Sequence, residues 1–171
     1  MGLDEVSIID QIAKIRKLTR LALPTDDTYL YRLGVALYGF ASINSFMTEI
    51  ICHIDKSQNR TSILEYETSG TILSIFKKVL KKIKVNEKYP EIHDIILQTA
   101  NVFENLNEQR NDIIHPYPIT NDKKEQILHR RKDKEGKYFE VNNAFLDQFI
   151  SKLDNVSNSL YEIRKAVSPD L

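Results

Sequence analysis

The run of residues 110–117, which reads RNDIIHPY, holds the side chains in this chain that are best suited to chemistry. Arg110 is followed directly by Asn111, and His115 stands five positions after the arginine. A histidine has a pKa of about 6.5, so it can take or give a proton near neutral pH. An arginine is always charged, and its planar guanidinium can bind two oxygens of one phosphate. Together these side chains could move a proton and stabilise negative charge on a phosphoryl group.

A long amphipathic helix is expected to carry these residues. Apolar side chains recur every three or four positions from about residue 90 onwards, and Pro90 suits a first helical turn. Pro116 and Pro118 cannot continue that helix, so His115 is expected at its end. On a continuous helix, positions 110 and 115 point about 140° apart. They can act together only if the helix end bends or if a two-fold dimer brings two copies of the motif into one cleft.

The pattern RNDIIH is the RNxxxH form of the Rx4-6H motif, and it resembles the HEPN family (higher eukaryotes and prokaryotes nucleotide-binding). The motif near the end of the penultimate long helix, with a further long helix after it, also resembles a HEPN bundle. The resemblance implies an all-α antiparallel bundle of four to five helices. It also implies a homodimeric endoribonuclease of the toxin or anti-phage kind, which cleaves RNA through the ribose 2′-hydroxyl without a metal or another cofactor. Arg110 and His115 would then be catalytic, and Asn111 would orient them or the phosphate.

Less specific interpretations of the same residues stay open. Arg110 could form an ion pair with Glu108 or Asp112, and His115 could donate to the last carbonyl groups of the helix. We expect Asp112 to face solvent. A second hypothesis is a catalytically silent HEPN module that serves as an RNA-binding or protein-interaction scaffold, because a fold does not decide the function of its site.

Tyr117 extends the match to the pattern RxxxxHxY. This pattern resembles that of toxins paired with MNT-type nucleotidyltransferase antitoxins, in which the tyrosine is adenylylated. The resemblance implies that Tyr117 is a modification site and that such an antitoxin is a partner. The chain is longer than those compact toxins, and a tyrosine between two prolines can also be a packed turn residue.

Two groups of basic residues are candidates for binding RNA through its phosphates, which would make binding strongly dependent on salt. Lysines crowd the segment before the motif helix, and arginines follow the motif. The residues that we single out are Lys77, Lys78, Lys81, Lys82, Arg130 and Arg131. A solvated helix face is the other meaning of such a lysine run. We interpret His53, His93 and His129 as structural or surface residues, because none has a partner at the spacing of metal ligands.

The chain has the length of one domain, residues 1–171, with a single core. Apolar periodicity predicts helices over residues 6–18, 28–54, 71–84, 90–115 and 144–166. Residues 1–24 are interpreted as an N-terminal accessory helix. Two runs, 126–131 and 137–141, flank a turn and predict a small β-hairpin within an insertion at 123–141, before the last helix.

Residues 33–51 are apolar nearly all round the predicted second helix. Such a helix is normally buried on more than one side, either inside a bundle or against a second subunit. We therefore consider it a candidate for the dimer seam.

Bulk composition excludes several classes of protein. Lysine plus arginine and aspartate plus glutamate both number 24, so no net charge draws the chain to nucleic acid from a distance. Cys52 is the single cysteine, which excludes an internal disulfide and suits a reducing cytoplasm. Charged residues interrupt the first 22 positions, as they would not in a signal peptide, and we expect no membrane span. No glycine-rich phosphate loop or GxSxG motif occurs among the five glycines.

Overall fold

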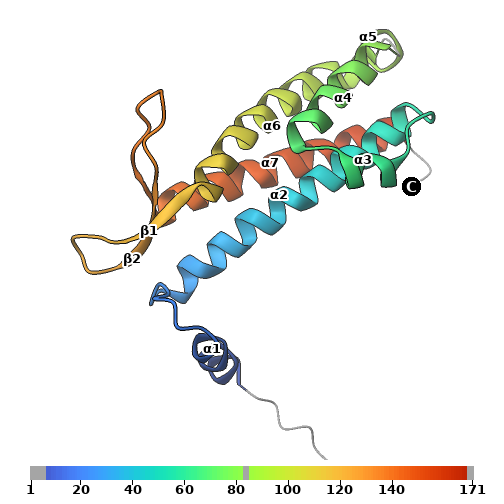
Figure 1. Cartoon of the computed structure of the whole chain (residues 1–171). Coiled ribbons are helices and arrows are strands. Elements are labelled where there is room, and N and C mark those ends of the chain that lie inside the picture. The colour runs from blue at the N-terminus through green and yellow to red at the C-terminus, as the bar shows by residue number, and fades with distance from the viewer. Residues whose placement is uncertain (1–6, 83–84, 169–171) are drawn as a thin grey trace, which may run out of the picture.

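The longest helix, α2 (Asp27–Ile54), is the element around which the other long helices pack. The structure is a computed structural model that describes residues 7–82 and 85–168. In Figure 1, α2 runs side by side with α7, and α6 lies beside α7. The other long helices are α4 (Ser69–Lys82), α6 (His93–Ile114) and α7 (Asn143–Val167). Their bounds agree with the predicted helices to within a few residues.

Three short helices connect the long ones. They are α3 (Arg60–Tyr66), α5 (Val85–Lys88) and the 3₁₀ turn η1 (Pro90–Ile92). Asn59 caps α3, because its side-chain oxygen accepts from the backbone N–H of Ser62. Pro90 opens the 3₁₀ turn that leads into α6, as the missing proline N–H allows.

The core lies where α2, α4, α6 and α7 face one another. Phe40 on α2 stacks on Phe103 of α6 with ring centroids 5.8 Å apart and parallel planes, and Phe149 of α7 closes the same cluster. The side chains of Met47 and Phe76 are completely buried. The predicted apolar stripes of the long helices thus meet in one core, as the single-domain interpretation requires.

Helix α2 is also the only described helix that is long and apolar enough to cross a membrane, judged by length and composition alone. The core helix of a soluble protein passes the same test. Because α2 packs against α3, α4, α6 and α7, a single helix of this kind does not indicate a membrane protein.

A small antiparallel sheet of three strands precedes α7, with the order β1-β2-β3. The predicted hairpin is confirmed as the pairing of β2 with β3, although β3 is shorter than expected. The strand before them was not predicted. The strands are β1 (Pro116–Thr120), β2 (Gln126–Arg130) and β3 (Glu140–Val141). The fold is therefore mainly α with a small sheet, rather than all-α with one hairpin.

Strand β1 was missed because Pro116 and Pro118 argue against a strand. It is an edge strand that pairs only with β2, and Tyr117 and Ile119 lie opposite His129 and Ile127. Residues two apart turn their backbone groups to the same side of a strand, so both proline nitrogens can lie on the side that has no neighbour.

Tyr29 anchors the sheet to the start of α2. Its hydroxyl donates to the carbonyl of Val141 at 2.9 Å and accepts from the backbone N–H of Leu128 at 3.1 Å. Strands β2 and β3 are therefore both fixed to one buried side chain, at a position where Leu128 and Val141 lie opposite each other. This contact sets the position of the sheet relative to the helices.

The N-terminal helix α1 (Ile8–Lys17) lies apart from the bundle, beyond the start of α2 (Figure 1). None of its residues is buried, and Ile8, Ile9 and Ile15 are exposed. Arg16 attaches it to α2 through an ion pair with Asp27. Ile12 and Ile15 line an open apolar hollow that α2 and α7 border, and residues 1–6 lie outside the described part.

The first half of α2 is less covered than its second half. Helix α4 has 14 residues against the 28 of α2, so it covers about 21 Å of a helix about 42 Å long. Tyr31, Leu37 and Tyr38 are accordingly exposed, with 75 %, 43 % and 80 % of their surface accessible. The apolar helix predicted at 33–51 is thus buried at its end and open at its start.

Candidate functional site

Arg110 lies in the last turns of α6, and its side chain crosses towards α2. Its guanidinium carbon is 5.8 Å from the ring centroid of Phe40, and Nη1 donates to Oδ1 of Asn111 at 3.4 Å. Among the described residues no carboxylate forms an ion pair with Arg110. Neither Glu108 nor Asp112 is therefore its ion-pair partner, and no carboxylate of residues 7–82 and 85–168 neutralises the charge of this guanidinium.

His115 is the C-cap residue of α6, with φ −102° and ψ 14°. Its backbone N–H donates to the carbonyl of Asn111 at 3.1 Å, so the main chain still follows the helix at this point. The imidazole is exposed and has no hydrogen-bond partner within residues 7–82 and 85–168. The interpretation in which its side chain caps the last carbonyl groups is not what the structure shows.

Arg110 and His115 of one chain do not come together. Arg110 and Asn111 line a hollow of about 500 Å³ between α6 and the segment 67–70 at the start of α4. His115 is not part of that lining. Because the helix continues almost to His115, the two side chains keep the divergence that helical geometry gives them.

The lysine run of α4 continues the surface beside Arg110. Lys77, Lys78 and Lys81 line a second hollow, of about 350 Å³, which shares Gly70 with the hollow at Arg110. Lys77 forms an ion pair with Glu104 at 3.0 Å, which leaves Lys78 and Lys81 directed to solvent. The side chain of Lys82 lies outside the described part. Lys78 and Lys81 therefore add positive charge to the hollow next to the one that Arg110 lines.

Arg130 is held inside the protein instead of facing solvent. Its Nε donates to Oδ1 of Asp112 at 2.7 Å, and its Nη2 lies 3.3 Å from Asp133. Only 13 % of the Arg130 side chain and 6 % of the Asp112 side chain are accessible. The expectation that Asp112 faces solvent is wrong, because β2 brings a cation to that side of α6.

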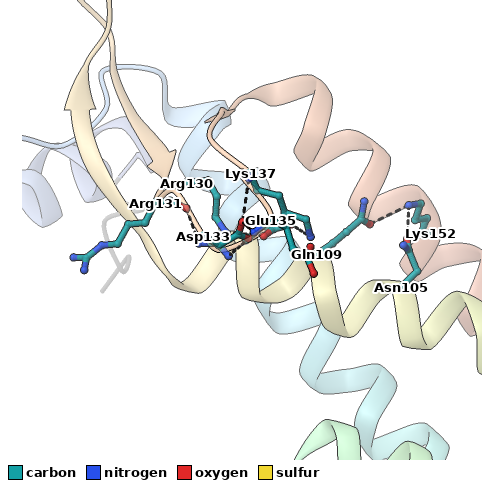
Figure 2. A network of polar contacts seen from close by, with 9 residues as sticks. Asn105, Gln109, Arg130, Arg131, Asp133, Glu135, Lys137 and Lys152 are labelled. Atoms are coloured by element: carbon teal, nitrogen blue, oxygen red, sulfur yellow. Dashed lines mark hydrogen bonds and ion pairs between the residues drawn. The ribbon is translucent and has the colours of Figure 1, made fainter.

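Figure 2 shows this network at the base of the β2–β3 hairpin. Asp133 also accepts from the backbone N–H groups of Glu135 and Lys137, and these bonds lower the pKa of its carboxyl although partial desolvation opposes them. Lys152 of α7 donates to the side-chain oxygens of Asn105 and Gln109, which ties α7 to α6. The helix end that bears the RNDIIH motif is thus fixed on two sides.

Arg131 points away from that network (Figure 2) and lies over an aromatic cluster on the sheet. The cluster consists of Tyr117, His129 and Tyr138. The hydroxyl groups of the two tyrosines are 3.4 Å apart, and this hydrogen bond, with some desolvation, raises the pKa of Tyr117. Tyr117 is half-buried, so its ring is fixed in place while one side stays open.

Sequence reasoning missed His129 and Tyr138 as members of a cluster. Their proximity depends on the register of β1 with β2, in which Tyr117 lies opposite His129. Strand β1 was not predicted because it contains Pro116 and Pro118. The one signal in the sequence for strand β1 was the spacing of Tyr117 and Ile119, which are two positions apart and would therefore share one face of a strand.

No family model, curated protein or solved structure that was compared with this chain matches it. In the part of the chain that the structure describes, no three histidine, cysteine, aspartate or glutamate side chains gather as metal ligands would.

Proposed function

We propose that this protein is a metal-independent endoribonuclease of HEPN type, a cytoplasmic toxin or anti-phage effector that acts as a homodimer. The main support for the proposal is that two side chains at the end of α6 are available to a substrate. Arg110 has no carboxylate partner among the described residues, and the imidazole of His115 is exposed and free of side-chain bonds in the same set. Cations and imidazoles that a fold leaves available in this way are suited to a phosphoryl substrate.

The reaction needs one proton removed and one proton supplied. The ribose 2′-oxygen forms a bond to phosphorus as its proton passes to a base, and the bond from phosphorus to the 5′-oxygen breaks as that oxygen gains a proton. A neutral imidazole can take the first proton, and a protonated imidazole can give the second. Arg110 would stabilise the charge that develops on the phosphoryl oxygens. The products are a 2′,3′-cyclic phosphate and a free 5′-hydroxyl.

The divergence of Arg110 and His115 supports a dimer. A two-fold axis beside the end of α6 would bring Arg110 of one copy into the same cleft as His115 of the other. Exposed apolar side chains flank this place: Leu37 lies one turn before Phe40 on α2, and Ile114 lies one turn after Arg110 on α6. Their accessible fractions are 43 % and 40 %. A second copy would cover these side chains and complete the site.

The test is cleavage of total RNA by purified protein in EDTA. Arg110→Ala and His115→Ala remove the two proposed groups, and His93→Ala is the control because His93 lies at the opposite end of α6. We expect cleavage by the parent and the control, and none by the two motif variants. Equal cleavage by all four proteins would contradict the proposal. Binding of RNA without any cleavage would favour the silent scaffold instead.

A further inference from the structure

The aromatic cluster on the sheet is built from three neighbouring positions. His129 lies 5.9 Å from the ring centroid of Tyr117 and 4.1 Å from that of Tyr138, with tilted planes in both cases. Tyr117 and His129 are paired across β1 and β2, so their side chains project from the same face of the sheet. Tyr138 enters from the segment just before β3. The rings form one continuous surface.

This surface is not part of the core. Tyr138 has 58 % of its area accessible, and Tyr117 and His129 are half-buried. The alternate residues of β2 and β3, Leu128 and Val141, pack towards the helices instead. Exposed tyrosines that contact a histidine at a tilt leave ring faces available to a flat ligand.

Positive charge borders the rings. The guanidinium carbon of Arg131 lies 6.0 Å from the centroid of Tyr117. Within the described residues Arg131 and Lys132 have no carboxylate partner, because the nearby Asp133 is bound to Arg130. The cluster therefore combines aromatic faces with cations that can contact phosphates. This combination is typical of surfaces that bind single-stranded nucleic acid without strict sequence preference.

We propose that Tyr117, His129 and Tyr138 form a stacking platform for the bases of single-stranded RNA, and that Arg131 contacts its backbone. This proposal rests on the ribonuclease function and names the form of RNA that the site takes. Tyr117 follows His115 by two residues, a distance of about 7 Å along the chain. A base stacked on Tyr117 thus places its sugar and phosphate close to the imidazole. Bases in a duplex are already stacked and cannot use such a surface.

Binding is measured in the His115→Ala background, so that cleavage does not consume the probe. The probe is a labelled single-stranded RNA of mixed sequence, about 12 nucleotides long, which exceeds the span of one such platform. Fluorescence anisotropy then gives the Kd of the background protein and of versions that also carry Tyr138→Ala or Tyr138→Phe. Tyr66→Ala is the control, because Tyr66 is 78 % exposed and lies on α3.

We expect Tyr138→Ala to weaken binding by about five- to 150-fold, the effect of losing one stacked base. Tyr138→Phe keeps the ring and is expected to bind within about two-fold of the background protein, as is Tyr66→Ala. An abasic strand of the same length is expected to bind equally to the background protein and to Tyr138→Ala. A purely structural cluster would give the opposite pattern: unchanged RNA affinity in Tyr138→Ala and reduced stability.

Unchanged affinity of Tyr138→Ala, or an abasic strand bound as tightly as the complete RNA, would overturn the platform. Neither result depends on cleavage. Failure of the parent to cleave RNA would contradict the proposed function alone, because binding to the rings is measured in a protein that lacks His115. The two proposals can therefore fail separately.

Discussion

The guanidinium of Arg130 on β2 donates to the buried carboxylate of Asp112 on α6 across 2.7 Å. Asp112 lies between Arg110 and His115 in sequence but on another side of the helix. Lys137 approaches the second carboxylate oxygen to 3.9 Å. The ion pair thus joins the sheet to the helix end that carries both candidate catalytic residues.

Removing either member of this pair is expected to destabilise the fold. Arg130→Ala leaves the buried carboxylate of Asp112 with only Lys137, 3.9 Å away, and Asp112→Asn leaves Arg130 with only Asp133. The expected loss in the free energy of unfolding is at most about 3–5 kcal/mol, the effect of breaking a buried pair completely. Urea denaturation followed by circular dichroism measures this loss. Arg131→Ala, on the exposed neighbour, should stay within about 0.5 kcal/mol of the parent. Equal effects at positions 130 and 131 would show that the ion pair does not hold the sheet.

Because Tyr29 is buried, we expect the free energy of unfolding to fall at alkaline pH. Burial raises the pKa of its hydroxyl above the ordinary value of 10.0. The folded state therefore keeps the phenol proton when the unfolded chain has begun to lose it. The resulting stabilisation is complete below the unfolded pKa and is lost as the pH rises through the folded one.

The matched variant is Tyr29→Phe, which also removes two hydrogen bonds and should cost about 2 kcal/mol at neutral pH, at about 1 kcal/mol for each bond. Between about pH 9 and about pH 11, its unfolding free energy should fall less steeply than that of the parent. Tyr66→Phe, at an exposed position, should keep the parental slope. If the unfolding free energy of Tyr29→Phe fell as steeply with pH as that of the parent, groups other than Tyr29 would cause the loss of stability at alkaline pH.

The proposed dimer seam predicts that a charge at Leu37 separates the two copies. Leu37→Glu places a carboxylate on an apolar surface, and burying an unpaired charge there is costly. Sedimentation should give the parent twice the 19.9 kDa mass of one chain and the variant a single chain, with RNA cleavage lost. Leu64→Glu is the control, because Leu64 is 42 % exposed on α3. A parent that sediments as one chain and still cleaves RNA would contradict the seam.

If each active site combines Arg110 of one copy with His115 of the other, two inactive variants should restore activity when they form a mixed dimer. Arg110→Ala and His115→Ala are each inactive, but a dimer that contains one of each retains one intact pair. Unfolding and refolding the two variants together should restore cleavage to about a quarter of the parental rate, because half of the random dimers are mixed and each has one of two sites. No recovery in demonstrably mixed dimers would show that each site draws both groups from one chain.

The long helices could be predicted from sequence because their apolar residues repeat with a local period. Pro116 correctly indicated where α6 ends, and His115 is found at that end. The environment of Asp112 could not be predicted in the same way. Its partner Arg130 is 18 residues away in sequence, and only the position of β2 brings the two together.

The sheet is a second feature that the sequence predicted only in part. Prolines normally argue against a strand, so the sequence does not predict the edge strand β1 or the pairing of Tyr117 with His129 that depends on it. Helix α1 is a third. Its amphipathic pattern predicted the helix itself, but it could not tell that the described part of the chain leaves every residue of this helix at least partly exposed.

The most direct test of the central claim is cleavage of a defined RNA in EDTA, compared with the same RNA carrying a single 2′-deoxy substitution at the cleaved position. We expect the parent to cleave the first RNA, leave a 2′,3′-cyclic phosphate and spare the second, while His115→Ala cleaves neither. Cleavage of the 2′-deoxy position, or equal cleavage by His115→Ala, would contradict the claim.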